Sequence, residues 1–251
     1  MLKKVLKSIS PPICIDLFRL AFPLKSNHSQ TGATGNLIEM EFIDFWANTS
    51  LFALEVIQRH GRLNELRLLS LGNRMAHLAD YVAVFGKVYH STLLKTMFPL
   101  ATDDLQVLEG DFFDLGALEV DCVISQGSIH CLNDRRYGNE ANQAGCQRPY
   151  QAAKKLRQII GDKSIPVVVS IAVHRTESMI DDNARLSHEK FVDSFLGAGF
   201  SLQEYFFDYC CFGMPPLPEY LEPRYRRSQE LPTNEQAPSE YNYVIGNYYF
   251  V

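Results

Sequence analysis

The chain has 251 residues and a formal net charge of −5, with 46% hydrophobic and 21% charged residues. This composition is globular and supplies apolar side chains for a sizeable core, while the negative charge offers no general attraction for nucleic acid, so we expect no nucleic-acid partner. The six cysteines form no CxxC pair and no His pair has zinc spacing, which predicts reduced thiols and no metal site.

Residues 1–36 are predicted to form a basic amphipathic N-terminal helix followed by a linker. Prolines and charges interrupt the apolar part of MLKKVLKSISPPICIDLFRLAFPLK, which excludes a secretory signal and a spanning helix. Two interpretations fit residues 1–25: a helix that lies on an anionic membrane surface, and a helix packed on its own domain. We therefore expect a cytoplasmic protein, with contact at the inner face of the cell membrane as one of these alternatives.

From residue 37 to residue 251 the pattern is that of a single α/β domain. Residues 37–59 have the apolar spacing of one or two helices, and short apolar strands then alternate with helical patterns. This alternation predicts a mostly parallel sheet with helices on both faces. The predicted strands cover 66–72, 87–93, 104–115 with its following turn, 120–125, 165–173, 201–209 and 241–251, and the predicted helices cover 75–86, 150–161 and 187–200.

Ligands of such sheets bind beyond the carboxyl ends of the strands, near the point where the strand order reverses. The segment SIHCLNDRRYGNE (128–140) comes after the fourth strand and is expected at this edge. A proline-rich insertion, residues 212–239, separates the last two strands and is too long for a hairpin turn. It is expected either to be an exposed loop with solvated arginines, or to form a lid in which an anionic group meets Arg224, Tyr225, Arg226 and Arg227.

This order of elements, with its aromatic final strands, resembles the class I S-adenosylmethionine-dependent methyltransferases over roughly residues 62–251. The resemblance implies a Rossmann-like methyltransferase fold, a seven-stranded sheet with an antiparallel C-terminal strand, and S-adenosylmethionine as cofactor. The turn SLGNRMAHL (70–78) stands where the superfamily has a glycine-rich loop, and keeps Gly72 followed by Asn73. KVYHSTLL (87–94) stands where the superfamily has a ribose-binding carboxylate, and offers His90 or Ser91 in its place.

The resemblance assigns the adenine end of the cofactor to LEGDFFDL (108–115). Asp111 would accept a hydrogen bond from the adenine amino group, and Phe112 would pack on the ring. The alternative is that Asp111 merely caps a turn, although Asp114 is the residue expected to cap the next element of the chain. Ser125, at the end of the fourth strand, completes the implied cofactor-binding set.

A narrower resemblance is to little-characterised methyltransferase-like proteins found with bacterial cell-surface polysaccharide genes. It rests on LGNRMAHLADYVAVF (71–85), SIHCLNDRRYGNE (128–140) and DDNARLSHEKF (181–191), although Asn139 stands where that group has an acid. The resemblance implies methylation of a hydroxyl on a sugar or glycan precursor.

Methyl transfer from a sulfonium needs positioning and a base that takes the proton of the acceptor. His130 is the candidate base because imidazole titrates in the right range, and Asp134 would orient it or bind substrate. Arginines after the fourth strand would bind phosphate or carboxylate, or face water. The candidate substrate contacts are Arg135, Arg136, Tyr137, His174, Asn183 and Arg185.

Two alternatives to a methyltransferase fit the same residues, because the glycine-rich turn keeps one glycine and the ribose-binding acid is absent. One is a catalytically inactive scaffold in a glycan-assembly complex. The other is a transferase that uses another nucleotide-type donor.

Overall fold

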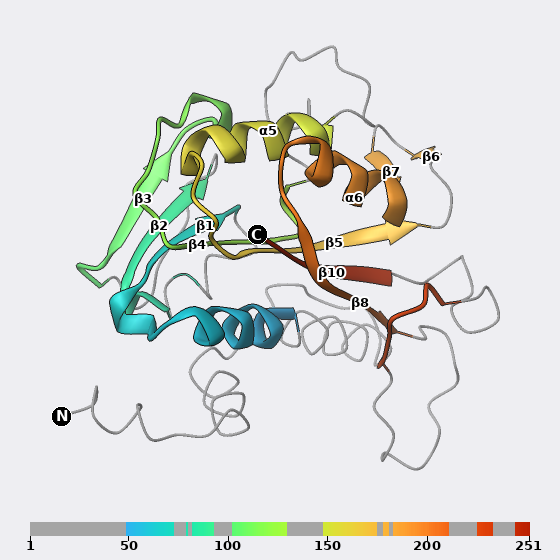
Figure 1. The fold of residues 1–251 in the computed structure, drawn as a ribbon, viewed down its shortest axis with the longest axis horizontal. Coiled ribbons are helices and arrows are strands. Elements are labelled where there is room, and N and C mark those ends of the chain that lie inside the picture. Colours follow the sequence, from blue (N-terminus) through green and yellow to red (C-terminus); the bar gives the residue numbers. More distant parts are fainter. Residues whose placement is uncertain are drawn as a thin grey trace, which may run out of the picture. The chain divides into compact units, whose positions relative to one another are not determined.

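A computed structural model describes residues 49–72, 79, 82–92, 102–129, 148–174, 178–180, 183–210, 225–232 and 244–251. All of them belong to the unit Thr49–Val251, the second of two units in the chain. Figure 1 draws these residues in colour. The N-terminal helix and linker predicted at 1–36 lie outside the described residues.

A mixed sheet forms the centre of the unit (Figure 1). Its strands succeed one another in the order β3-β2-β1-β4-β5-β10-β8-β9. Strands β1 to β5 are parallel, and β10 is antiparallel to both β5 and β8, so β8 runs parallel to β5. The strands on this path are β1 (Arg67–Leu71), β2 (Lys87–Thr92), β3 (Leu105–Glu109), β4 (Cys122–Gln126), β5 (Val167–His174), β8 (Leu202–Cys210), β9 (Tyr225–Ser228) and β10 (Val244–Phe250).

The order β3-β2-β1-β4-β5 is that of a doubly wound Rossmann-like sheet. The predicted α/β class is therefore confirmed: the chain has a Rossmann-like methyltransferase fold, with β10 as the antiparallel C-terminal strand. All seven predicted strands are present, and six of them lie within three residues of their expected bounds; β3 ends at Glu109, and the rest of the predicted range 104–115 is the turn after it.

Three short strands were not predicted from the sequence, so the sheet has more than seven strands. β6 (Ser178–Ile180) and β7 (Asn183–Ser187) form a hairpin, and β7 pairs with the end of β5. β9 lies inside the insertion 212–239 and pairs with β8 in antiparallel fashion. Four residues of the expected lid are thus an edge strand of the sheet.

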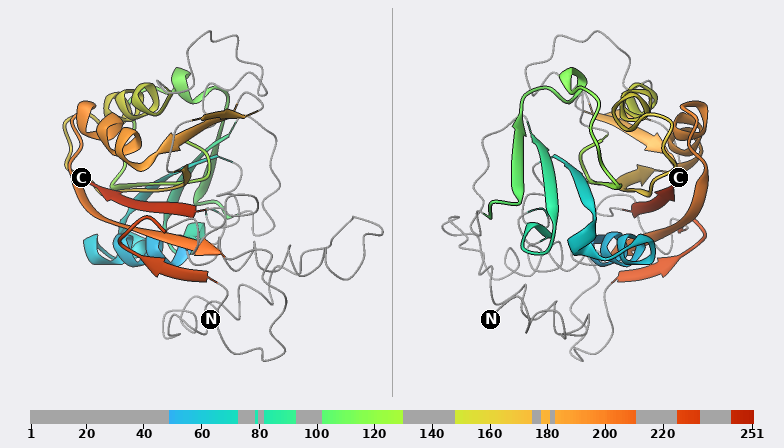
Figure 2. Two further views of the ribbon diagram at one scale, coloured as in Figure 1. Left: turned by 90° about the vertical axis from the view of Figure 1, so that its right-hand side faces the viewer. Right: turned by 60° about the vertical axis from the view of Figure 1, so that its left-hand side comes forward.

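Helices cover both faces of the sheet, as predicted (Figures 1 and 2). α5 (Arg148–Ile160) and α6 (His188–Gly197) lie on one face, and a helix at 49–60 lies on the other. Side chains of successive residues in a strand point to opposite faces of the sheet. Leu69 and Leu71 accordingly pack in the core under α5 and α6, and Leu68 packs in the core under the 49–60 helix. No helix among the described residues has the length and apolarity needed to cross a membrane.

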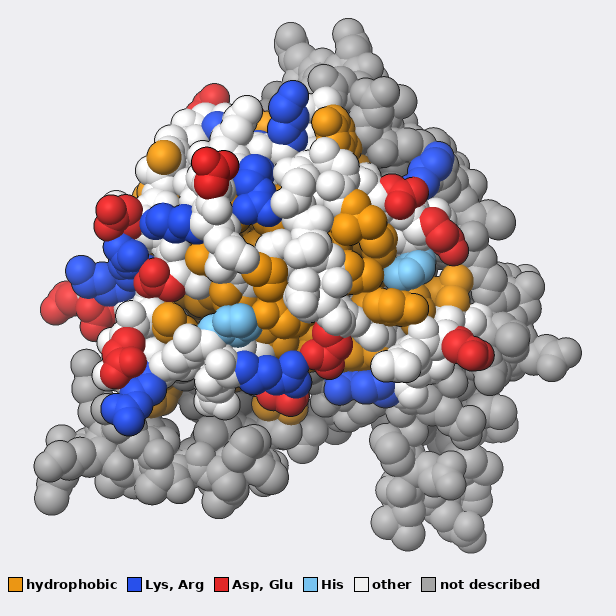
Figure 3. All heavy atoms as spheres, viewed as in Figure 1, with side chains coloured by type: hydrophobic (Ala, Val, Ile, Leu, Met, Phe, Trp, Pro, Cys, Tyr) orange, Lys and Arg blue, Asp and Glu red, His pale blue; other side chains and the backbone are white. Residues whose placement is uncertain are grey.

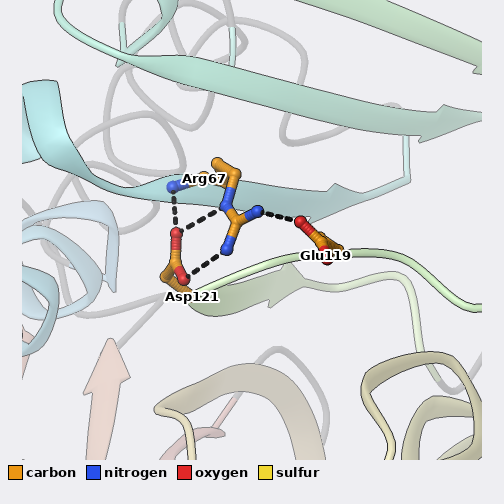
Figure 4. Close-up of polar contacts among 3 residues, drawn as sticks. All are labelled: Arg67, Glu119 and Asp121. Atoms are coloured by element: carbon orange, nitrogen blue, oxygen red, sulfur yellow. Dashed lines mark hydrogen bonds and ion pairs between the residues drawn. The ribbon is translucent and has the colours of Figure 1, made fainter.

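An ionic clamp joins the amino ends of β1 and β4 (Figure 4). The Asp121 carboxylate accepts hydrogen bonds from the Arg67 backbone N at 2.8 Å and from its Nε and Nη2 at 3.0 Å each. Arg67 Nη1 also donates to Glu119 Oε2 at 2.6 Å. In return the Asp121 backbone N donates to the Arg67 carbonyl at 2.8 Å. The clamp fixes the register of the two central strands at the edge opposite their carboxyl ends.

Candidate functional site

The carboxyl ends of β1 and β4 meet where the strand order reverses, with β2 and β3 on one side and β5 on the other. Gly72 comes directly after β1 with φ at +86°, and its N donates to the Ser91 carbonyl at 2.9 Å. A β-carbon at this position would overlap the Ser128 Oγ and Cβ atoms. Gly72 is therefore required twice, for its left-handed backbone and for the close approach of the chain that leaves β4.

β2 ends one residue before its expected end at residue 93, so His90 lies inside the strand. The strand continues to Thr92, two residues beyond His90, and Thr92 is buried. His90 is 0% exposed, with Nδ1 3.0 Å from Ser70 Oγ, and burial lowers the pKa of His90 to about 4. His90 is thus a neutral residue inside the sheet, and a cofactor contact by His90 stays a prediction.

The turn after β3 is built around Asp111. Its Oδ1 accepts a hydrogen bond from Phe113 N at 2.9 Å and so caps the short helix η3 (Phe112–Asp114). The alternative that Asp111 caps a turn is therefore confirmed, whereas the expectation that Asp114 caps the next element stays a prediction. Asp111 is half-buried, and its Oδ2 has no hydrogen-bond partner among the described residues, which leaves one carboxylate oxygen for a ligand.

Phe112 is 2% exposed and belongs to the core under α5, where its ring meets Phe113 edge to face at 5.4 Å. At Gly110, where φ is +135°, no atom of the described segments lies within 4 Å of the place a β-carbon would take. Gly110 is therefore open to solvent, and Phe112 packs inward.

Ser125 carries a buried polar atom that the described fold does not satisfy. It lies near the end of β4 between Leu71 of β1 and Val169 of β5, and is 1% exposed. Its Oγ has no hydrogen-bond partner in the part of the chain that the structure describes. Leaving a buried hydroxyl unpaired costs about 1–3 kcal/mol, so such groups are usually completed by water or a ligand.

Gln126, the last residue of β4, joins the 49–60 helix to the carboxyl edge of the sheet, a link that was not predicted from the sequence. Its Nε2 donates to Thr49 Oγ1 at 2.7 Å and to Ser50 Oγ at 3.0 Å, and its Oε1 accepts from Ser50 Oγ at 3.2 Å. Its carbonyl accepts from Ser128 Oγ at 2.9 Å. A polar residue at the end of an apolar strand was the available signal.

Three candidate substrate contacts lie on backbone that the structure describes. His174 is the last residue of β5 and pairs with Ser187 of β7, and Asn183 and Arg185 are both in β7. The end of β5 and the end of β7 therefore lie side by side, and a substrate contact by these three residues stays a prediction. The other predicted residues of the site lie outside the described residues: Asn73, His130, Asp134, Arg135, Arg136 and Tyr137.

The Arg227 side chain contacts two residues of β8, whereas the lid interpretation had it meeting an anionic ligand. Its Nε lies 2.9 Å from Asp208 Oδ1, and its guanidinium carbon lies 3.7 Å from the centroid of the Phe206 ring. Asp208 is 1% exposed and also accepts from Asn247 Nδ2 at 3.1 Å, and Ser170 Oγ donates to Asn247 Oδ1 at 2.7 Å. Arg224 and the side chains of Tyr225 and Arg226 lie outside the described residues.

The described part of the chain holds no group of His, Cys, Asp and Glu side chains that could bind a metal ion. The exposed side chains of the face in Figure 3 mix acidic and basic residues, with hydrophobic side chains between them. Gly72, Asp111 and Ser125 are the predicted cofactor-binding residues that the structure describes near the carboxyl edge of the sheet, and their role stays a prediction.

The strand order places the protein in the class of Rossmann-like methyltransferase folds. No family model matches the chain, and no curated protein matches it. Among solved structures, it is similar to a SAM-dependent methyltransferase from Aquifex aeolicus, at 13% identity and a TM-score of 0.45, over 78% of this chain and 88% of that one.

Two further solved structures show the same level of similarity. The [4+2]-cyclase SpnF has 15% identity and a TM-score of 0.43, over 56% of this chain and 53% of that one, so the chain spans about half the length of this neighbour. An S-adenosylmethionine-dependent methyltransferase from Mesorhizobium loti has 10% identity and a TM-score of 0.45, over 77% of this chain and 95% of that one. With identities of 10–15% and TM-scores of 0.43–0.45, these similarities say nothing of the reaction that the protein catalyses.

Proposed function

We propose that the protein is an S-adenosylmethionine-dependent methyltransferase whose cofactor binds at the carboxyl edge, around the ends of β1, β3 and β4. The observation that carries the proposal is the buried Ser125 hydroxyl, which has no hydrogen-bond partner within the described segments and lies beside the point where the strand order reverses. Ligands of Rossmann-like sheets bind at that point.

The described residues fit such a cofactor in part. The turn at Gly110 and Asp111 offers open space and a carboxylate oxygen, which suit an adenine amino group. Ser125 offers a hydroxyl, and the Gly72 turn brings backbone close to the end of β4. The end of β2 offers Thr92 in place of a carboxylate, so the ribose hydroxyls lack their usual acceptor on this strand.

S-adenosylmethionine, when bound, supplies a methyl group on a positively charged sulfur. In the proposed reaction His130 takes the proton of the acceptor hydroxyl, and Asp134 orients its ring. Arg135, Arg136 and Tyr137, which follow β4 in the sequence, would hold the acceptor. His174 at the end of β5, and Asn183 and Arg185 in β7, would contact it too. Resemblance in sequence at 71–85, 128–140 and 181–191 supports a sugar or glycan acceptor in cell-surface polysaccharide synthesis.

A second candidate function is supported by the end of β2. Thr92 in place of a carboxylate favours either a different nucleotide-type donor or a fold that has lost catalysis and serves as a scaffold. A different donor would bind at the same edge, whereas a scaffold would bind none.

Asp111→Asn tests the proposal without disturbing the turn. The amide oxygen can still cap Phe113 N, but an NH2 group replaces Oδ2 and would meet the adenine amino group donor to donor. We expect S-adenosylhomocysteine to bind the wild type and to bind Asp111→Asn about 10-fold more weakly, a loss of about 1.4 kcal/mol.

Asp114→Asn is the matched control, since it removes the same charge from the same short helix without touching the cap. Its affinity in isothermal titration should equal that of the wild type. Equal affinities for all three proteins would contradict the adenine position, and binding of a sugar nucleotide but not of S-adenosylhomocysteine would favour the second candidate.

A further inference from the structure

Gln126 connects the 49–60 helix to the carboxyl edge of the sheet. It is 3% exposed, and its side-chain amide is held by the hydroxyls of Thr49 and Ser50 at 2.7–3.2 Å. Thr49 is itself fully buried. The buried Gln126 amide contacts the hydroxyls of both residues, so the helix and the end of β4 hold each other in place.

The main chain around Gln126 connects its held side chain to the turns after β4 and β1. Its carbonyl receives the Ser128 hydroxyl at 2.9 Å, and the next residue, Gly127, donates from N to the Ser170 carbonyl at 2.6 Å. Ser128 in turn fills the space beside Gly72 that a side chain there would need. Gly72 N donates to the Ser91 carbonyl at 2.9 Å, so the chain of contacts runs from the helix across the ends of β4, β1 and β2.

We propose that Gln126 is a positioning residue, which uses the hydroxyls of Thr49 and Ser50 to fix the turns after β4 and β1 in the shape that binds the nucleoside. It does not touch the ligand itself, because its side chain points to the 49–60 helix. The effect on binding rests on the proposed function, while the effect on the two turns does not.

The described contacts favour positioning over a purely structural role. Gln126 occupies the last position of β4, the next residue Gly127 bonds to Ser170 within β5, and Ser128 lies against Gly72 at the end of β1. The clamp between Arg67 and Asp121 holds the same two strands at their opposite ends. Loss of that clamp should weaken the sheet as a whole, whereas loss of the Gln126 contacts should loosen one edge.

Thr49→Val tests the inference, because valine keeps the shape of threonine and removes the hydroxyl that accepts from Gln126 Nε2. Thr49→Ser retains the hydroxyl and serves as the conservative variant. Asp121→Ala, at the opposite end of the strands, serves as the control for lost stability. Native-state hydrogen exchange at the amides of Gly72 and Gly127 and the Kd of S-adenosylhomocysteine are measured for each protein.

In Thr49→Val we expect exchange at these two amides to accelerate about 10-fold relative to the sheet core, and Kd to rise about 5-fold, corresponding to about 1 kcal/mol. Thr49→Ser should resemble the wild type, and Asp121→Ala should lower stability without a selective effect on either amide or on Kd. Unchanged exchange in Thr49→Val would overturn the inference, as would faster exchange with an unchanged Kd.

A wild-type protein that binds no S-adenosylhomocysteine would overturn the proposed function instead. The exchange measurement needs no ligand and would then decide by itself whether Gln126 positions the turns.

Discussion

Ser128 occupies the space that a side chain on Gly72 would need, so the ends of β4 and β1 interlock. Gly72→Ala should therefore be strongly destabilising, since it adds overlap with Ser128 to the strain of an alanine at a φ of +86°. We expect a loss of about 3 kcal/mol in the free energy of unfolding, measured by urea titration.

Ser128→Gly provides the companion change. It removes the overlapping atoms, so the double variant Gly72→Ala with Ser128→Gly should recover about half of the loss and keep only the backbone strain. Equal stability of the single and double variants would show that the two residues do not interlock.

The pH dependence of stability should carry a contribution from His90. Burial lowers the pKa of His90 to about 4, whereas an unfolded histidine titrates near 6.5, so between these values the unfolded chain binds more protons than the folded one. The contribution is complete above about pH 6.5 and is lost as the pH falls toward 4, to a total of about 3 kcal/mol.

His90→Gln removes this titration and keeps a polar partner for Ser70. The difference in unfolding free energy between wild type and variant should be flat above pH 7 and shrink below pH 6. Parallel curves from pH 7 to pH 4.5 would show that His90 is not buried as a neutral ring.

The clamp at the amino ends of β1 and β4 should depend on Asp121 far more than on Glu119 (Figure 4). Asp121→Ala removes three hydrogen bonds to Arg67, one of them to its backbone, and should cost about 1.5 kcal/mol in urea unfolding. Glu119 is 81% exposed, so Glu119→Ala should change stability by less than about 0.5 kcal/mol. Similar losses in the two variants would contradict this ranking.

Arg227 should stabilise the edge of the sheet because it neutralises a buried carboxylate. Arg227→Met leaves Asp208 charged at 1% exposure, and should cost about 2 kcal/mol. Adding Asp208→Asn should restore part of this loss in a double-mutant cycle.

Arg59→Met is the matched control on the same face of the sheet. It removes two contacts of 2.7 Å, to Glu55 and Glu204, but all three side chains are exposed, so the cost should stay below about 1 kcal/mol. A cost in Arg59→Met equal to that in Arg227→Met would argue against the special role of the buried Asp208.

Much of the sheet could be predicted because its strands are apolar and its helices end at clear signals. VVVSIAVH in β5 is a nearly continuous apolar run, as expected for a strand covered on both faces, and α5 ends beside Gly161. β9 could not be predicted, because YRRS has no strand pattern and is held by its pairing with β8 and by the contacts of Arg227 with Asp208 and Phe206.

The candidate site was harder to predict because its geometry depends on contacts between distant segments. Asp111 and Asp114 both fit a helix cap in sequence, and only the hydrogen bond to Phe113 N separates them. The strand KVYHST was expected, but its sequence does not show that the His90 imidazole is 0% exposed inside the sheet. The link from Gln126 to Thr49 spans 77 residues, beyond the reach of any local pattern.

The proposed S-adenosylmethionine site is tested most directly by native mass spectrometry of the purified full chain with S-adenosylhomocysteine, in competition with adenosine diphosphate and a sugar nucleotide. We expect a one-to-one complex with S-adenosylhomocysteine that is favoured over both competitors and is diminished in Asp111→Asn but not in Asp114→Asn. A complex with a competitor alone, or no complex at all, would contradict the assignment of the carboxyl edge as an S-adenosylmethionine site.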